Sequence, residues 1–196
     1  MTELDLYFDL SSPYSYMAAT QLPAIAERHG ASIRWKPMVL TAVFDAAGNR
    51  MPASSPTKAR WMLRDLKRWS DRYGVPFRLN SRFPLNTIPA MRLVLVGERH
   101  GLAQEVALEA FRRMWVEDVD INAPEQLAAI ARAAGLPDGA EAGVTDPAIK
   151  GALKTSTDEA IARDVFGAPA IFVGDQLFFG NDRLDFVEDA LRATLG

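Results

Sequence analysis

The order of apolar and polar residues predicts a strand, a helix and a second strand at the start of the chain. Residues 4–9 alternate between apolar and polar side chains, which is the two-residue period of a strand. Pro13–His29 has a helical pattern and ends at Gly30, a glycine cap. Ser32–Lys36 alternates again and gives the second strand. Because the joints are short, these elements form a βαβ unit, and the two strands should be parallel.

The far end of the chain predicts a hairpin and a last helix. Two apolar runs, Ala170–Val173 and Gln176–Phe179, flank Gly174–Asp175. A two-residue Gly-Asp turn between apolar runs is typical of a β-hairpin. The segment from about Asp182 to Leu195 carries its apolar residues on one helical face, which predicts an amphipathic helix.

Between these ends the pattern is helical, with almost no strand signal. Pro56–Tyr73 places Trp61, Leu63, Leu66 and Trp69 at spacings that predict a face toward the core. Further helices are predicted at 86–100, 102–116, 124–134 and 146–163. The fold class is therefore α/β, with a small mixed sheet built from both ends of the chain and interrupted by an all-helical insertion.

Composition indicates a folded protein of the cytoplasm. With 196 residues, 48% of them hydrophobic, the chain can bury a substantial core as one compact unit. A net charge of −3, mixed in sign, does not predict nucleic acid or a membrane surface as a partner. No run approaches the ~20 apolar residues of a membrane span. The N-terminus has no signal-peptide pattern and the chain has no cysteine for disulfides, so we expect a cytoplasmic location.

The four residues from Ser12 to Ser15 open the first predicted helix, directly after the first strand. In a thioredoxin-like fold this place belongs to the redox pair Cys-x-x-Cys, but here both ends are serine. The helix N-terminus still offers free N–H groups and a partial positive charge, which suit an anion. If that anion is a thiolate, another molecule must bring it, and glutathione is the obvious candidate.

Three segments together resemble one family. Phe8–Tyr16 resembles the opening of the 2-hydroxychromene-2-carboxylate isomerases and their relatives, the kappa-class glutathione transferases. Val165–Val173 is similar to the family's cis-proline segment, and Phe179–Val187 to its glutathione-binding turn. The family belongs to the DsbA branch of thioredoxin-like folds, which carries a helical insertion. The resemblance implies two domains, a thioredoxin-like one at 1–40 plus 165–196 and a helical insertion at 41–164.

The resemblance assigns Ser12 to the glutathione sulfur and makes Pro169 a cis-proline that faces the start of the first helix. Ser12 matches the family serine that hydrogen-bonds the sulfur, and a hydroxyl donor at a helix N-terminus favours a thiolate over a thiol. Position alone would make Ser12 only an N-cap before Pro13, and the two roles can coexist. A cis bond before Pro169 would turn the backbone of Ala168 outward to pair with the cysteinyl unit of glutathione. The alternative is a trans proline that simply begins a strand.

A second group of residues is implied for the γ-glutamyl end of glutathione. Asp182 can bind the amino group of the γ-glutamyl unit. The N–H groups at the helix start beside Asn181 can donate hydrogen bonds to the carboxylate of that unit. Arg183 would bind as well or only support the turn through an ion pair. Without the resemblance, this segment is a turn with an N-cap.

The resemblance also implies where the acceptor substrate binds, in segments that correspond to those lining the aromatic-acid pocket of the isomerases. These segments contain Asn49, Lys58, Arg60 and Asn86. Polar residues in loops and at helix starts are also commonly just solvated. The chain departs from the family at Phe44–Asp45, where isomerases commonly carry a lysine that helps hold the substrate carboxylate.

The resemblance implies a glutathione-dependent isomerase in the catabolism of aromatic compounds. Its substrate would be a conjugated aromatic α-keto acid or the cyclic hemiketal, and glutathione would be the cofactor, returned after reversible thiolate addition. Two alternatives stay open: a kappa-like transferase that releases the conjugate, and a non-catalytic thioredoxin-like protein that binds glutathione. The family also implies a homodimer. Two distant histidines without cysteine do not predict a metal site.

Overall fold

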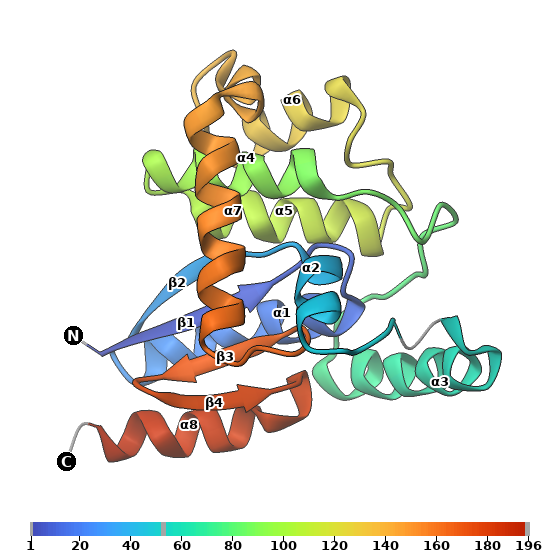
Figure 1. Cartoon of the computed structure of the whole chain (residues 1–196), viewed down its shortest axis with the longest axis vertical. Helices are drawn as coiled ribbons and strands as arrows, with labels where there is room; N and C mark the ends of the chain where they lie inside the picture. The colour runs from blue at the N-terminus through green and yellow to red at the C-terminus, as the bar shows by residue number, and fades with distance from the viewer. Residues whose placement is uncertain (1, 52–53, 195–196) are drawn as a thin grey trace.

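A computed structural model describes residues 2–51 and 54–194 of the chain. Its centre is a four-stranded mixed sheet in the order β2-β1-β3-β4, as Figure 1 shows. The strands are β1 (Glu3–Phe8), β2 (Ser32–Pro37), β3 (Ala170–Val173) and β4 (Gln176–Phe179). Strands β1 and β2 are parallel, while β3 is antiparallel to both β1 and β4. The predicted βαβ unit and the predicted hairpin are therefore confirmed, and β1 joins them edge to edge.

Helices connect the two halves of the sheet. The longer ones are α1 (Pro13–Arg28), α3 (Pro56–Tyr73), α4 (Ile88–Arg99), α5 (Ala103–Trp115), α6 (Pro124–Ala133), α7 (Pro147–Ala162) and α8 (Leu184–Ala193). Each lies where a helix is predicted, and α8 follows a single 3-10 turn at Asn181–Arg183. The predicted end of that last helix at Leu195 lies outside the described residues. Two short elements were not predicted, α2 (Leu40–Ala46) and the 3-10 helix η2 (Ala140–Thr145).

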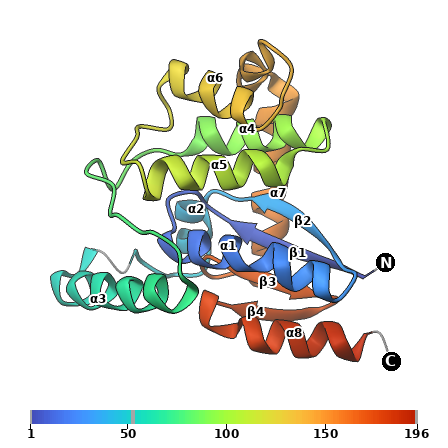
Figure 2. The same cartoon turned by 180° about the vertical axis from the view of Figure 1, so that it is seen from behind.

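The sheet is covered on both faces. Helices α1 and α8 lie on one side, seen in front in Figure 2, and α2 and α7 on the other. One apolar core runs from the side chains of β1 through α1 into α4 and α5. Between 41 and 164 the described residues form helices and loops and no strand. The division into a thioredoxin-like domain and an insertion domain stays an interpretation, because the core crosses that boundary.

Helix α3 does not bury the face that its pattern predicts. Leu66 is fully buried, but Trp61 is 57% exposed and Leu63 is 40% exposed, so the prediction for these two residues is wrong. Met62 takes the buried position instead. The reason is that α3 projects from the rest of the molecule and packs on α1 along a narrow stripe, which leaves its neighbouring face open (Figure 1).

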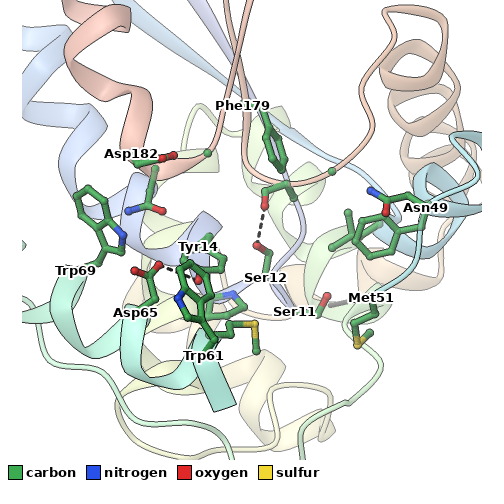
Figure 3. A pocket seen from close by; sticks show the side chains of 18 of the residues that line it. Ser11, Ser12, Tyr14, Asn49, Met51, Trp61, Asp65, Trp69, Phe179 and Asp182 are labelled. Atoms are coloured by element: carbon green, nitrogen blue, oxygen red, sulfur yellow. Dashed lines mark hydrogen bonds between the residues drawn. The ribbon is translucent and has the colours of Figure 1, made fainter. Parts of the chain in front are cut away.

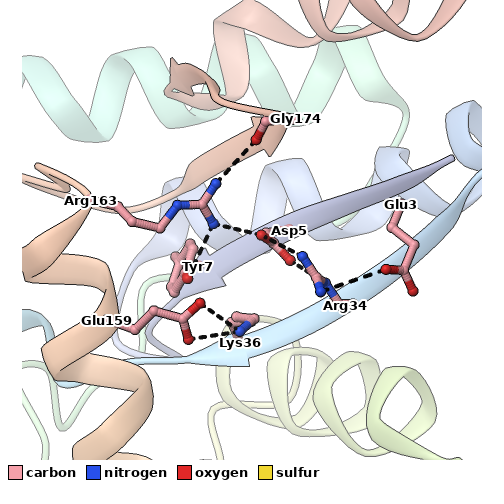
Figure 4. A network of polar contacts seen from close by, with 8 residues as sticks. All are labelled: Glu3, Asp5, Tyr7, Arg34, Lys36, Glu159, Arg163 and Gly174. Atoms are coloured by element: carbon pink, nitrogen blue, oxygen red, sulfur yellow. Dashed lines mark hydrogen bonds and ion pairs between the residues drawn. The ribbon is translucent and has the colours of Figure 1, made fainter. Parts of the chain in front are cut away.

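Two of the polar residues of β1, Asp5 and Tyr7, are buried as well, beneath α7. Asp5 is only 2% exposed and receives hydrogen bonds from Arg34 at 2.6 Å and Arg163 at 2.6 Å, as Figure 4 shows. Next to it, Lys36 pairs with Glu159 of α7 at 2.8 Å. Burial by itself would raise the pKa of Asp5, but the two arginines outweigh it and hold that pKa below its usual value. Arg163 ends α7, so this network fixes the beginning of the loop that leads to β3.

Candidate functional site

Ser12 and Ala168 meet at the start of α1, although 156 positions separate them. The Ser12 hydroxyl donates a hydrogen bond to the Ala168 carbonyl at 3.1 Å (Figure 3). It also accepts one from the Ser15 N–H at 3.1 Å. Ser12 is therefore the N-cap of α1, with Pro13 in the first turn. The Ala168–Pro169 peptide bond is cis, as predicted, and a second cis bond precedes Pro84.

A cavity of about 510 Å³ opens beside the Ser12–Ala168 contact. Aromatic and aliphatic side chains form most of its wall, with a few polar groups, a composition typical of small-molecule sites. The lining residues are Ser11, Ser12, Pro13, Tyr14, Leu40, Phe44, Asn49, Met51, Trp61, Met62, Asp65, Trp69, Phe83, Gly167, Ala168, Phe179, Gly180, Asn181 and Asp182. The start of α1, the loop before β3, the end of β4 and helix α3 thus converge on one place.

The predicted γ-glutamyl residues lie on the same side of this cavity as α3. Asn181 and Asp182 line it, whereas Arg183 is not among the described lining residues and pairs with the Asp182 carboxylate at 2.6 Å. The Asn181 carbonyl accepts a hydrogen bond from Tyr73 of α3 at 2.6 Å. Gly180 has a φ of 102°, and a Cβ there would lie 2.4 Å from Asp182 Oδ1. Only glycine lets the Asp182 carboxylate keep this position.

Tyr14 and Asp65 form a polar contact in the cavity that sequence reasoning missed. The Tyr14 hydroxyl donates to the Asp65 carboxylate at 3.0 Å. Burial and this carboxylate raise the pKa of Tyr14 well above its ordinary range, so its hydroxyl stays protonated at neutral pH. Tyr14 lies within the Ser-Pro-Tyr-Ser motif, which could have drawn attention to it; Asp65 carried no signal, because it is one of several charged residues along α3.

The predicted acceptor-side residues do not all reach the cavity. Asn49 lines it, and its side chain donates to the Phe166 carbonyl at 3.1 Å. Lys58, Arg60 and Asn86 are exposed, and none of them is among the described lining residues. Arg60 contacts Thr57 on its own helix, and the Asn86 side chain accepts the Ile88 N–H at 3.0 Å.

Aromatic walls take the place of those polar residues. Trp61 and Phe179 lie on opposite sides of the Ser12–Ala168 contact in Figure 3, and both are substantially exposed. The Phe179 ring lies against Phe166 at a tilt of 48°, with centroids 4.6 Å apart. It also covers Gly167, where a Cβ would lie 2.7 Å from the ring. Sequence reasoning assigned Trp61 to the core, because a helical stripe looks the same whether it faces a core or a cavity.

Two further observations concern the described residues. They contain no cluster of three or more His, Cys, Asp or Glu residues that could hold a metal ion. No helix among them is both long and apolar enough to cross a bilayer.

Strand β1 is followed by helix α1, whose N-cap Ser12 lies opposite a cis-proline. This arrangement defines the thioredoxin-like class, here with serine at both redox positions. The chain belongs to the family of DSBA-like thioredoxin domains, whose family model matches residues 3–192. This match covers both the sheet and the helical insertion.

Comparison with characterised proteins gives two groups of relatives. The chain is 36% identical to a 2-hydroxychromene-2-carboxylate isomerase of Sphingobium xenophagum over 191 residues, which is 96% of this chain and 97% of the relative. It is 29% identical to glutathione S-transferase kappa 1 of Caenorhabditis elegans, covering 98% and 92% of the two chains. A solved structure of a 2-hydroxychromene-2-carboxylate isomerase superposes with a TM-score of 0.91 at 28% identity, over 98% of this chain and 96% of that one.

The serines at both redox positions lead to a first prediction. The protein should show no thiol–disulfide oxidoreductase activity, because it has no sulfur nucleophile of its own. Insulin reduction by dithiothreitol should proceed at the protein-free rate, with a DsbA-type enzyme as the positive control. Clear acceleration by this protein would contradict the prediction.

Proposed function

We propose that this protein is a glutathione-dependent isomerase of the 2-hydroxychromene-2-carboxylate isomerase type, which acts on a conjugated aromatic α-keto acid. The observation that carries the proposal is the Ser12–Ala168 contact at the cavity wall, where a hydroxyl at a helix N-terminus lies beside a cis-proline. The relatives named isomerases and kappa glutathione transferases support both the reaction type and the cofactor. Catabolism of aromatic compounds is the expected setting.

Glutathione would lie across the Ser12–Ala168 contact, with its γ-glutamyl end toward Asp182. Its cysteinyl N–H would donate a hydrogen bond to the Ala168 carbonyl. In the protein alone, this carbonyl accepts a hydrogen bond from the Ser12 hydroxyl. The hydroxyl would then turn to donate to the sulfur, and the partial positive charge at the start of α1 would add to this stabilisation of the thiolate. Negative charge on Asp65 and Asp182 suits the ammonium group of the γ-glutamyl unit. The thiolate, the cysteinyl N–H and the γ-glutamyl ammonium group of the ligand would thus each have a complementary group of the site.

The reaction itself needs the thiolate and a held electrophile. The sulfur forms a bond to the β-carbon of the conjugated ketone, and the π electrons move to the carbonyl oxygen as an enolate. The former double bond can then rotate. When the enolate electrons return, the carbon–sulfur bond breaks, and the isomer and the glutathione thiolate are released. No net oxidation or reduction occurs.

Turnover measurements separate this proposal from its alternatives. If the protein is an isomerase, we expect it to convert a large molar excess of substrate over glutathione into the isomer, with free glutathione recovered at the end. Stoichiometric loss of glutathione into a stable conjugate would instead indicate a kappa-like transferase. Saturable glutathione binding without any turnover of electrophiles would indicate a non-catalytic binding protein. A homodimer and a cytoplasmic location, expected from the family and the composition, stay predictions.

Asp182→Ala should weaken glutathione binding by about 1–3 kcal/mol, the usual cost of losing a charge-assisted hydrogen bond. Calorimetry with wild type and variant measures this. Asp185→Ala is a matched control, because Asp185 lies on the next turn, is also exposed and is not among the described cavity residues. Equal affinity in both variants would leave Asp182 as a turn residue without a ligand role.

A further inference from the structure

The cavity carries charge of one sign only. Its described lining includes two carboxylates, Asp65 and Asp182, and no Lys, Arg or His. Pro52 and Ala53 follow Met51 in the sequence and lie outside the described residues, and they carry no charge either. Arg50 lies between two lining residues in the sequence, but its side chain is exposed and is not among the described lining residues. Any anion inside the cavity would therefore lack a cationic partner.

Bound glutathione would make this imbalance larger. Its thiolate would lie at Ser12, next to the reacting carbon of the acceptor. Moving a second anion from water into the same apolar space costs desolvation free energy, and no opposite charge in the described lining offsets that cost. Repulsion between charges a few ångströms apart is also stronger here than in water. The carboxylate of a keto acid is thus poorly suited to the interior of the cavity.

The opposite is true of an uncharged aromatic group. The wall also includes Phe44, Met51 and Phe83, and Met51 lies on the side away from Asp182 in Figure 3. Trp61 and Phe179 add two further aromatic side chains to the wall. Flat aromatic ligands pack well against such rings and against the polarisable sulfur of methionine. The Phe179 ring can lie against the backbone only because position 167 is glycine.

We propose that the cavity recognises its acceptor as an uncharged aromatic conjugated ketone, and that a carboxylate on the acceptor stays at the solvent-exposed opening without being bound. The substrate class then includes aryl enones that have no carboxylate, in addition to aryl keto acids. This inference rests on the proposed function, because it concerns the acceptor of the same thiolate addition.

Two matched probes test the inference, 4-phenyl-2-oxobut-3-enoate and its uncharged counterpart 4-phenylbut-3-en-2-one. Both are supplied as their cis isomers, conversion to the trans isomer is followed by absorbance with catalytic glutathione, and each kcat/KM is divided by the rate constant measured with glutathione alone. We expect the corrected value for the ketone to equal that for the acid or to exceed it by up to roughly tenfold. A preference for the acid of roughly tenfold or more would overturn the inference. If neither probe reacts faster than without protein, the proposed function fails as well.

Variants at positions 50 and 51 test where the acceptor and its carboxylate lie. Met51→Lys puts a cation of similar length into the cavity wall and should shift the acid-to-ketone ratio toward the acid by roughly tenfold, while Met51→Gln should leave the ratio unchanged. A ratio that does not respond to Met51→Lys would overturn the placement of the acceptor in this cavity. If wild type favours the acid and Arg50→Gln removes that preference, Arg50 binds the carboxylate and the inference is wrong.

Discussion

Ser12→Ala should lower turnover by roughly 10²-fold, the usual effect of removing one donor that stabilises developing negative charge. The Ser12 hydroxyl is the side-chain donor at the start of α1 that already lies beside the Ala168 carbonyl. Without it, the pKa of bound glutathione should rise, because the thiolate loses a hydrogen bond while the thiol loses little. Thiolate absorbance against pH, together with steady-state rates, measures both effects. Glutathione affinity should fall far less, because the Ala168 and Asp182 contacts remain.

The neighbouring serines are the controls for this prediction. Ser15 Oγ is buried and has no hydrogen-bond partner among the described residues, so Ser15→Ala should keep most of the activity. Ser11→Ala should do the same, since it is the Ser11 N–H, not the hydroxyl, that is bonded to Asp9. Ser12→Ala also removes an N-cap, which costs about 1 kcal/mol of stability, so thermal unfolding must be recorded alongside the rates. If Ser11→Ala or Ser15→Ala is the inactive variant, the sulfur lies elsewhere.

Asp5→Ala should destabilise the fold by about 3 kcal/mol, the low end for removing one partner of a buried ion pair. The side chain of Asp5 is almost fully buried, and its loss leaves Arg34 and Arg163 without their shared carboxylate. Both arginines are partly exposed and can be partly resolvated, which keeps the cost at that low end. Urea unfolding measures the change. Glu3→Ala is the matched control, because Glu3 pairs with the same Arg34 at 3.6 Å but is exposed, and it should change stability by less than about 0.5 kcal/mol.

The Asp5 carboxylate should also contribute to the pH dependence of the free energy of unfolding. Its pKa in the folded protein is lower than in the unfolded chain, so its contribution is complete above about pH 4 and is lost as the pH falls through the folded value. Wild type should therefore lose stability on acidification more steeply than Asp5→Ala. Parallel curves for the two proteins would show that the Asp5 carboxylate does not carry the effect.

The regular elements could be predicted where local chemistry marks both ends. The predicted bounds of helix α3 agree with those observed, and the local chemistry is consistent with them: Ser55-Pro56 is typical of a helix start and Gly74 of a helix end. Helix α2 was missed because it spans only two turns and has no side-chain cap. The burial of Asp5 was also not predictable, since alternation in β1 says nothing of α7, which covers the polar face from a distant part of the chain.

The site could be predicted in part. Ser12, Ala168, Asn181 and Asp182 surround one cavity, and the family motifs indicated them although they are far apart in the sequence. Trp61 and the other side chains that α3 contributes could not be found in this way. Their place depends on how one helix projects from the fold, which is a property of tertiary packing and leaves no period of its own in the sequence.

Serine at positions 12 and 15 has a consequence for an enzyme that handles electrophiles. A cysteine there would be a target for alkylation by the enzyme's own substrate, and each such event would inactivate one molecule permanently. This chain has no thiol to lose. Under the proposed function its nucleophile would arrive with glutathione and leave with it, so a damaged nucleophile would be replaced by another glutathione molecule while the protein stays intact.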